Sequence, residues 1–331
     1  MWTAGAAPAW AVAGGLLGAA LLVLPLPPRL RWLGVPLLLP LLWPPIERPP
    51  EGRFELVAAD IGQGTAVLLR TRSHLLVYDT GPQYSPESDA GARVLLPLLR
   101  ARGETAVDLL VLSHRDSDHV GGAASLLGTV PGRGGWGLVR EISSSLEPAH
   151  ALLQRGVPQQ RCDAGQSWSW DGVHFELLHP PPEDHGRGLK PNALSCVLRV
   201  QAADGRSLLL TGDIEAPQEA ALVARLGAAL QSDLLLVPHH GSRTSSSPAF
   251  IDAVAPRIAV VQAAYRSRFG HPAPDIVARY TSRGITVVRS DSCGAWSLAA
   301  SGATACERLE SARYWHHRSF AEPAAPGALA P

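Results

Sequence analysis

The sequence predicts an α+β domain of layered sheets and helices, preceded by two apolar segments. Apolar runs of strand length follow one another through short turns at the start of the domain, and helix-like stretches enter only later. Composition changes sharply near residue 47, where an apolar N-terminal part gives way to a globular texture. This order of elements argues against a doubly wound parallel sheet, in which strands and helices alternate throughout.

Residues 1–46 contain the apolar segments Ala9–Leu24 and Trp32–Ile46. Both are shorter than the roughly 20 residues of an ideal spanning helix, yet they carry almost no charge, and we interpret them as a membrane helical hairpin. A loosely packed apolar tail is the alternative. Arg29 and Arg31 lie between the segments, and the positive-inside rule places them in the cytoplasm. The following domain is then expected on the outer, periplasmic side of the cytoplasmic (inner) membrane.

A linker at 47–53 leads into a domain predicted at 54–309, and an Ala- and Pro-rich tail at 310–331 is predicted to be disordered. Short apolar runs predict strands at Phe54–Ala59, Ala66–Arg70, Leu75–Tyr78, Leu109–Leu112, Val173–Leu178, Leu194–Val200, Ser207–Leu210, Leu234–Val237, Ile258–Val261 and Ile285–Val288. Helices are predicted at 90–102, 119–127, 216–226, 248–254 and 274–283.

Charge and cysteine content limit the possible functions. The 29 Lys and Arg residues balance 29 Asp and Glu residues, so no global field draws the chain to nucleic acid. A polyanion would have to be held by a local basic patch or by metal. The four cysteines include no CxxC pair, which argues against a structural zinc ribbon. A disulfide between Cys293 and Cys306, or unpaired thiols throughout, are both left open.

Four potential metal ligands follow the predicted strand at 109–112 within six residues: His114, Asp116, Asp118 and His119. Side chains at the end of one strand can converge on a small volume. A buried cluster of carboxylates and imidazoles is costly unless it is paired or binds metal. The loop therefore predicts a metal site, with a solvated polar loop as the alternative.

Polar motifs follow four other predicted strands. They are Asp60-Ile61-Gly62-Gln63-Gly64, Tyr78-Asp79-Thr80-Gly81, Thr211-Gly212-Asp213 and His239-His240-Gly241-Ser242. Together and in this order, the motifs resemble those of the metallo-β-lactamase superfamily. Its HxHxDH signature has a second histidine where this chain has Asp116. The resemblance implies a four-layer αβ/βα sandwich with a divalent metal site along one edge of the sheets.

The resemblance also implies a ligand set. One metal is expected on His114, Asp116 and Asp213, and a second on Asp118, His119, Asp213 and His240. His240 is preferred to His239 as the ligand, and His239 is expected beside the metals, with Asp118 and His239 as the catalytic residues. The oxygen ligand Asp116 shifts the preference of the first site away from zinc. We therefore expect one or two ions, manganese or zinc first and magnesium as the alternative.

Further residues are assigned to the surroundings of the metals or to the substrate. Asp60 is expected to orient a ligand histidine, as carboxylates commonly do, with plain strand-end hydrogen bonding as the alternative. The superfamily's separate third-motif histidine has no convincing counterpart. Asn192 or Ser195 stands at the comparable place, with His174, His179 and His185 as less favoured candidates. The remaining assignments to this group are Gln63, Ser242 and His271.

The particular residues within several motifs indicate one branch of this superfamily. Asp60–Gly64, Ser88-Asp89-Ala90-Gly91, Ser113–Gly122, His239–Ser242 and Gly270-His271-Pro272 resemble the carboxy-terminal domain of ComEC-type DNA-uptake competence proteins. The resemblance covers residues 54–300 and implies a metal-dependent nuclease that degrades the non-transported DNA strand during natural transformation. The implied partners are DNA, single-stranded first, the membrane, a DNA-uptake channel and the competence machinery.

Two other functions remain open. One is a phosphodiesterase acting on a small cell-surface substrate such as phosphorylcholine, and the other is a non-catalytic DNA- or metal-binding part of the channel. Tyr265-Arg266-Ser267-Arg268-Phe269 offers aromatic and arginine side chains of the kind that hold single strands, although a solvated loop has the same composition. β-Lactam hydrolysis is the least favoured activity, because no motif in the sequence indicates recognition of a lactam carboxylate and a fold alone does not assign a substrate.

Overall fold

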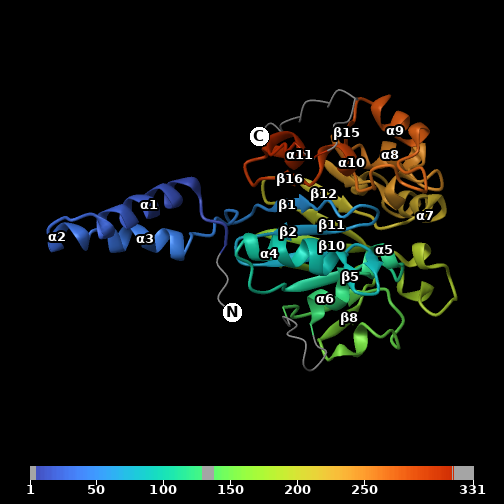
Figure 1. Ribbon diagram of the computed structural model, residues 1–331. Helices are drawn as coiled ribbons and strands as arrows, with labels where there is room; N and C mark the ends of the chain where they lie inside the picture. Colours follow the sequence, from blue (N-terminus) through green and yellow to red (C-terminus); the bar gives the residue numbers. More distant parts are fainter. Residues whose placement is uncertain (1–4, 129–137, 315, 317–331) are drawn as a thin grey trace. The chain divides into compact units, whose positions relative to one another are not determined.

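The computed structural model describes residues 5–128, 138–314 and 316. The chain divides into two compact units, the smaller made of Met1–Arg48 with Leu95–Thr105 and the larger made of Pro49–Val94 with Ala106–Pro331. Most of the tail predicted to be disordered lies outside the described residues, and Figure 1 draws that part as a thin grey trace.

The smaller unit is helical. It contains α1 (Ala9–Val23), α2 (Pro28–Arg31), α3 (Gly34–Leu42) and α4 (Leu96–Ala101). Helices α1 and α3 pack closely because glycines line their contact: a Cβ on Gly18 would lie 2.6 Å from the carbonyl oxygen of Gly34. The two apolar segments of the sequence thus form a helical hairpin.

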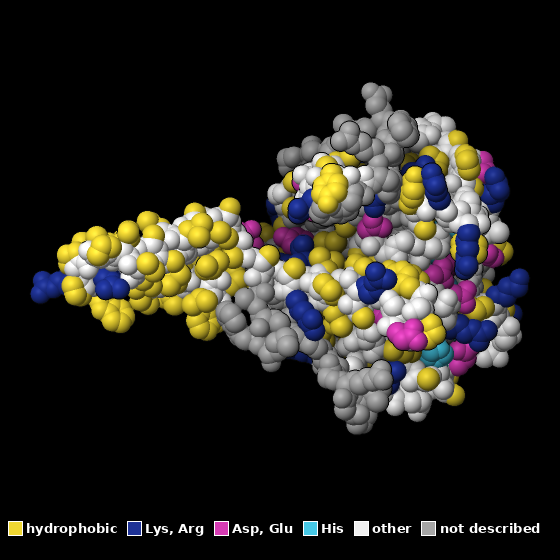
Figure 2. Space-filling view, viewed as in Figure 1, with side chains coloured by type: hydrophobic (Ala, Val, Ile, Leu, Met, Phe, Trp, Pro, Cys, Tyr) yellow, Lys and Arg dark blue, Asp and Glu magenta, His cyan; other side chains and the backbone are white. Residues whose placement is uncertain are grey.

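Large apolar side chains cover the outside of this hairpin. Leu16, Val23 and Trp32 are 69%, 81% and 71% exposed, and Figure 2 shows hydrophobic side chains over most of the visible face of the helices. α1 has 15 residues and α3 has nine. No helix among the described residues has the length and apolar character needed to cross a membrane, so these helices do not support the predicted membrane-spanning hairpin.

The larger unit is a sandwich of two mixed sheets (Figure 1). The first sheet has the order β17-β16-β1-β2-β3-β6-β7-β8. Its central strands are antiparallel from β16 to β3 and parallel from β3 to β8. The bounds are β1 Glu55–Ala58, β2 Val67–Arg70, β3 Leu75–Tyr78, β6 Leu109–Leu112, β7 Ile142–Ser144, β8 Gln159–Arg161, β16 Trp296–Leu298 and β17 Thr304–Cys306.

The second sheet has the order β15-β14-β13-β12-β11-β10-β9, and a separate pair is formed by β4 and β5. Strands β9 to β12 are antiparallel, whereas β12 to β15 are parallel. The bounds are β4 Gln83–Ser85, β5 Ser88–Asp89, β9 Ser167–Trp170, β10 Val173–His179, β11 Val197–Gln201, β12 Ser207–Leu210, β13 Leu234–Leu236, β14 Ile258–Val261 and β15 Thr286–Arg289.

Alternation along the strands divides the core into two layers. Successive strand side chains point to opposite faces, so Leu208 and Leu210 join the cluster between the sheets, and Leu209 joins a cluster on the outer face of the second sheet. That outer cluster is covered by three helices through buried side chains such as Leu222, Phe250 and Tyr280. The helices are α7 (Ala216–Leu226), α8 (Pro248–Val254) and α9 (Pro274–Thr281). Because both faces of the central strands are buried, their sequences read as continuous apolar runs.

The helix predicted at 119–127 is broken into α5 (Ser117–Val120) and α6 (Ala123–Leu127). The break falls at Gly121 and Gly122, where neighbouring backbone comes very close. A Cβ on Gly121 would lie 2.1 Å from the Gln83 nitrogen, and one on Gly122 would lie 2.4 Å from the Gly91 nitrogen. Close packing of this turn, not helix propensity, therefore sets its path. Short helices also occur at α10 (Ser290–Cys293) and α11 (Glu307–Glu310).

All four cysteines are paired. Cys162 after β8 is bonded to Cys196 before β11, which joins the first sheet to the second. Cys293 is bonded to Cys306, which joins α10 to the end of β17. The structure thus contains the pair that the sequence left open and one that it did not indicate.

Candidate metal centre

The loop after β6 brings the four-ligand motif to the edge of the first sheet. β6 ends at Leu112 and α5 begins at Ser117, so His114 lies in the loop and His119 in the helix. Both residues are buried, with 1% and 0% of their surface exposed. Buried imidazoles need a partner for each ring nitrogen, and the partners show what the centre is built to hold.

Asp79 orients His119. It follows β3 with a φ of +57° and lies beside the motif because Tyr78 pairs with Val111 in the parallel β3–β6 ladder. Its carboxylate lies 2.7 Å from His119 Nδ1 and accepts further hydrogen bonds from the Ser113 backbone nitrogen and hydroxyl, each 2.7 Å long. A carboxylate only accepts, so His119 carries a proton on Nδ1, and Nε2 is the nitrogen that it turns to the centre.

His114 is held in the same way. Its Nδ1 lies 3.0 Å from Ser113 Oγ, whose hydrogen is already donated to Asp79. The serine oxygen therefore accepts a hydrogen bond from His114 Nδ1, and Nε2 is left for another partner. Among the described residues, His114 Nε2 is buried without a hydrogen-bond partner.

His240 completes the pattern from the second sheet. It follows β13 with a φ of +54°, and its Nδ1 donates to the carbonyl oxygen of Gln262 over 2.9 Å. The Gln262 side chain is itself fixed by hydrogen bonds to Ala59 and Ala66 of the first sheet. All three histidines thus have Nδ1 engaged, and His114 and His240 each share a compact group of possible ligand atoms with His119.

Two carboxylates meet these nitrogens. Asp213 follows β12 and is 4% exposed, and its Oδ1 lies 3.1 Å from His119 Nε2 but without hydrogen-bonding geometry. Asp118 Oδ2 lies 3.3 Å from His240 Nε2. The Nε2 atoms of His119 and His240 are only 3.3 Å apart. With Nδ1 protonated on both rings, two bare Nε2 lone pairs would face each other unfavourably, so a positive charge, either a proton or a metal ion, is needed between them.

The residues therefore fit a divalent metal. Two groups place one ligand atom from each member within 4.8 Å of the others: His114, His119 and Asp213, and Asp118, His119 and His240. Imidazole nitrogens and carboxylate oxygens are the donors that zinc and manganese accept. The buried and unpartnered His114 Nε2 and Asp213 Oδ1 are the atoms that a metal would satisfy.

The electrostatics agree with this reading. Burial acts to lower the pKa of His119, but Asp213 and Asp79 raise it well above its ordinary value. Burial acts to raise the pKa of Asp213, but His119 and His240 bring it well below its ordinary value. The pKa of Asp118 is lowered in the same manner by His240 and His119, against the effect of burial. The centre thus holds ionised carboxylates and attracts positive charge.

His239 lies at the rim of the centre. It has a φ of +50°, its side chain is 21% exposed, and its Nε2 is 3.8 Å from Asp213 Oδ2. Its Nδ1 lies 3.0 Å from Thr244 Oγ1 and 3.4 Å from Glu215 Oε1. Ser242 lies behind it, with its hydroxyl 3.2 Å from Thr244 Oγ1. His239 is thus oriented by a hydroxyl and a carboxylate at Nδ1, while its Nε2 faces the centre.

Asp116 occupies a more exposed position than its predicted role implies. Its side chain is 44% exposed, and its Oδ2 lies 3.7 Å from His114 Nε2. It belongs to neither compact group, whereas His119 belongs to both. The compact groups are His114, His119 and Asp213, and Asp118, His119 and His240. His119 has only Nε2 left to bind metal, so it can serve one ion at a time, and the ligand assignments stay predictions.

The role expected for Asp60 is taken by Asp79. Asp60 pairs with Arg308 and contacts no ligand histidine among the described residues. The physical reason is the strand order: Asp60 follows β1, which β2 and β3 separate from β6. Three strand spacings place the ends of β1 and β6 roughly 14 Å apart. The sequence showed Asp79 in a strand-end motif, but only the strand order identifies its partner.

Ser195 and Asn192 support the site from outside. Ser195 Oγ lies 3.3 Å from His114 Nδ1 and accepts a hydrogen bond from the Asp213 backbone nitrogen over 3.1 Å. Asn192 accepts a backbone hydrogen bond from Ser195. His179 is buried, with Nδ1 donating to the Ser195 carbonyl oxygen, and joins neither metal group. His174 and His185 have partners elsewhere, at Ser169 and at Cys162.

Gln63 and His271 also lie near the centre. Gln63 accepts hydrogen bonds from the 264–267 segment. The ring of His271 lies 5.7 Å from that of His239 and 6.4 Å from that of His240. Sequence reasoning missed Thr244, Glu215 and Gln262, since their roles depend on contacts between distant loops.

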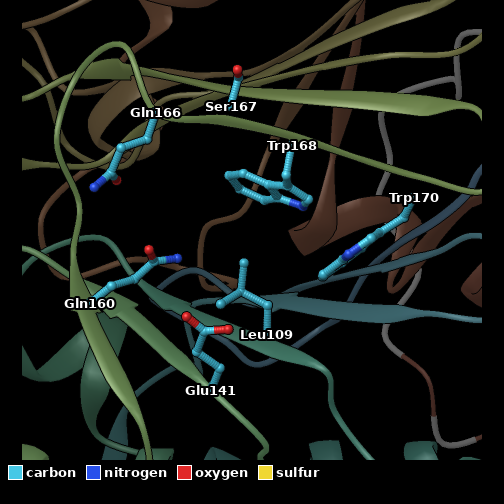
Figure 3. A pocket seen from close by; sticks show the side chains of 7 residues that line it. All are labelled: Leu109, Glu141, Gln160, Gln166, Ser167, Trp168 and Trp170. Carbon is cyan, nitrogen blue, oxygen red and sulfur yellow. The ribbon is translucent and has the colours of Figure 1, made fainter.

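A described cavity lies away from the candidate metal ligands. Its volume is about 360 Å³. It is lined by Leu109 at the start of β6, whereas His114 lies beyond the other end of that strand. Figure 3 shows Trp168, Trp170 and Glu141 around it. None of the candidate metal ligands is among its lining residues, which are Leu109, Glu141, Gln160, Gln166, Ser167, Trp168 and Trp170.

The chain resembles proteins of bacterial competence. It is 35% identical over 334 residues to Competence protein ComA of Neisseria gonorrhoeae, covering 97% of this chain and 44% of ComA. It is 34% identical to Recombination protein 2 of Haemophilus influenzae, covering 63% and 24% of the two chains. It is 30% identical to ComE operon protein 3 of Bacillus subtilis, covering 74% and 32%. The chain spans less than half the length of each of these relatives.

A family model identifies the domain. The model of the metallo-beta-lactamase superfamily matches residues 59–264, which include every candidate metal ligand. The match and the two-sheet sandwich confirm the predicted α+β sandwich fold, and the fold with its His and Asp clusters implies a divalent metal. The chain is related to competence proteins, and it belongs to the metallo-β-lactamase superfamily.

Proposed function

We propose that the larger unit is a divalent-metal-dependent hydrolase that cleaves phosphodiester bonds in DNA. The observation that carries the proposal is the orientation of His114, His119 and His240. Each has Nδ1 engaged by a protein partner, and each offers a ligand atom to a compact group that contains Asp213 or Asp118. Such preorganised nitrogen and oxygen donors are suited to hold one or two ions for hydrolysis.

The metal supplies the hydrolytic chemistry when bound, since it lowers the pKa of a water ligand and stabilises charge on phosphate oxygens. The protein's part is to orient and to position. Asp79 fixes the ring of His119, and Gln262 fixes that of His240. His239 faces the centre and is held by Thr244 and Glu215, so it is placed to contact a substrate oxygen.

DNA is proposed as the substrate because of the relatives. They are named for competence and recombination, which favours a role in DNA uptake with a channel as partner and the non-transported single strand as substrate. The balanced charge of the chain gives this choice no support by itself. Direct measurement on nucleic acid is therefore the first requirement.

We infer that the catalytic unit works outside the cytoplasm, at the outer face of the cytoplasmic membrane. Two disulfides favour an oxidising compartment, and the exposed apolar side chains of the hairpin suit contact with lipid. To test this placement, the chain is taken from cells, denatured and treated with a maleimide. The maleimide should label no cysteine unless a reductant is added first. Full labelling without reductant contradicts this placement.

The test of the activity uses the full chain in detergent, stripped of metal and reloaded with Mn²⁺, Zn²⁺ or Mg²⁺. Substrates are an end-labelled single-stranded oligonucleotide, its duplex, and 4-nitrophenyl phosphorylcholine. Asp118→Asn is the inactive variant. The matched control is Asp252→Asn, whose carboxylate is 62% exposed and pairs with Arg283 on the outside of α8 and α9.

Metal-dependent cleavage of the oligonucleotide that is lost in Asp118→Asn and kept in Asp252→Asn supports the nuclease. Cleavage of the phosphorylcholine substrate alone replaces DNA by a small phosphodiester. A folded, metal-loaded chain that cleaves neither substrate contradicts the proposed hydrolase and favours a binding role in the channel.

A further inference from the structure

The segment 264–271, here called the arginine–aromatic loop, connects β14 to α9 at the rim of the metal centre. Tyr265 and Phe269 are 47% and 54% exposed, and Arg266 and Arg268 are also exposed. Exposure of large aromatic side chains to water is unfavourable. Two such side chains within five residues, beside the candidate metal centre, therefore indicate a binding surface.

Each exposed aromatic ring carries an arginine. The Arg266 guanidinium lies 5.2 Å from the centre of the Tyr265 ring, and that of Arg268 lies 4.7 Å from the centre of the Phe269 ring. The loop therefore presents flat apolar faces and positive charge together. Planar bases linked by phosphates match both features, because the bases stack on rings and the phosphates pair with guanidinium groups.

A series of rings leads from this loop into the centre. Phe269 lies 5.9 Å from His271 with an interplanar angle of 29°. His271 in turn lies 6.4 Å from His240, a candidate metal ligand, at an angle of 25°. A nucleotide stacked on Phe269 is thus within about two ring spacings of the candidate ligand His240, which suits delivery of the adjacent phosphodiester.

Gln63 fixes the loop in this position. Its Oε1 accepts hydrogen bonds from the Ser267 hydroxyl over 2.9 Å and from the Ala264 backbone nitrogen over 3.4 Å. Within the loop, Ser267 donates to the Ala264 carbonyl oxygen, and Gly270 donates to that of Ser267. The loop consists of consecutive turns anchored to the first sheet's β1–β2 connection.

We propose that the arginine–aromatic loop is a base-stacking platform that holds a single strand and selects it over duplex, with Gln63 as a positioning residue. The proposal rests on the proposed function and goes further by assigning the strand-binding residues. Duplex bases already cover each other's faces, so a stacking platform favours unpaired bases.

The experiment compares two substrates of the metal-loaded full chain. One is a 12-nucleotide oligothymidine, and the other is bis(4-nitrophenyl) phosphate, which has the bond to be cleaved but no base. Phe269→Ala and Tyr265→Ala are expected to lower kcat/KM for the oligonucleotide about tenfold through KM, the usual effect of losing one base stack. Hydrolysis of the small diester is expected to change less than twofold. Phe269→Trp keeps a stacking face and is expected to keep wild-type kcat/KM.

Abasic DNA separates stacking from phosphate contacts. An oligonucleotide of the same length with abasic positions should react about tenfold more slowly with the wild-type chain, and Phe269→Ala should lower that rate no further. Gln63→Ala should raise KM for oligothymidine by a larger factor than it changes hydrolysis of the small diester. Tyr314→Ala, at a 95% exposed aromatic after α11, is the control and should behave as wild type.

The outcomes distinguish the two proposals. A wild-type chain that hydrolyses neither substrate contradicts the proposed function. Oligonucleotide hydrolysis that is unchanged in Phe269→Ala and Tyr265→Ala overturns the platform while leaving the nuclease intact. Equal loss on both substrates overturns it as well, because the loop would then only maintain the centre.

Discussion

Replacing Asp79 by asparagine should weaken metal binding although Asp79 is not a candidate ligand. The side-chain oxygen of the asparagine can still accept a hydrogen bond from the Ser113 backbone nitrogen. Its amide nitrogen, however, then faces His119 Nδ1 and Ser113 Oγ, which both donate hydrogen bonds to the aspartate. His119 can relieve the clash of donors only by moving its proton to Nε2. The nitrogen that faces the centre is then blocked.

The expected loss follows from that tautomer change. Groups that orient a metal ligand typically contribute 10–100-fold in affinity, so Asp79→Asn should raise the metal Kd by about 10- to 100-fold, or roughly 1.4–2.7 kcal/mol. The assay is competitive titration of Zn²⁺ or Mn²⁺ against a chromogenic chelator, with circular dichroism to confirm folding.

Asp60→Asn is the matched control, because Asp60 also follows a strand in an Asp-x-Gly motif but pairs with Arg308. It should bind metal within about twofold of wild type. The reasoning is refuted if folded Asp79→Asn binds metal as tightly as wild type, or if Asp60→Asn loses as much affinity as Asp79→Asn.

Three further predictions concern stability. Cys162→Ala with Cys196→Ala opens a bond that spans 34 residues and should lower the free energy of unfolding in urea by about 3–4 kcal/mol, whereas a loss below about 1 kcal/mol contradicts a formed bond. Gly122→Ala places a Cβ 2.4 Å from the Gly91 nitrogen and should cost about 3 kcal/mol in the same assay, together with metal affinity; a neutral effect would show that the turn can relax. Asp171 accepts hydrogen bonds from Thr71 and Ser73 that, against the effect of burial, bring its pKa well below the ordinary value. Its contribution is therefore complete above the unfolded pKa of about 4 and is lost as the pH falls towards the folded pKa. Asp171→Asn should destabilise the metal-free chain by about 2 kcal/mol at pH 7, and the difference from wild type should shrink below pH 4; a difference independent of pH argues against the lowered pKa.

The sequence predicts the central strands well because these strands are buried on both faces. All residues of β2, β3, β6 and β12 are buried, and their runs of Val and Leu are visible without any partner. The strand β8 is different: its residues Gln159–Arg161 are exposed, and its place depends on pairing with β7. A strand that is exposed and held only by hydrogen bonds to a neighbouring strand has no apolar pattern in the sequence, so β8 was missed.

The candidate site was predictable as a set of motifs but not as a set of contacts. His114, Asp118 and His119 stand out as polar residues that follow an apolar strand, whereas Asp213 and His240 were assigned through the resemblance to the metallo-β-lactamase motifs. Which carboxylate orients which histidine depends on strand order, and that order places β3, not β1, beside β6. The disulfide between the two sheets was hidden for the same reason, because nothing local relates Cys162 to Cys196.

Bound metal would also explain how a chain with balanced net charge can bind a polyanion. Asp118 and Asp213 are ionised, and the imidazoles of the centre are neutral once their Nε2 atoms act as ligands. One divalent ion cancels the charge of these two carboxylates, and a second makes the centre positive, beside the exposed Arg266 and Arg268. Affinity for DNA, and not only its cleavage, should thus depend on the metal, since the net charge of the chain supplies no attraction.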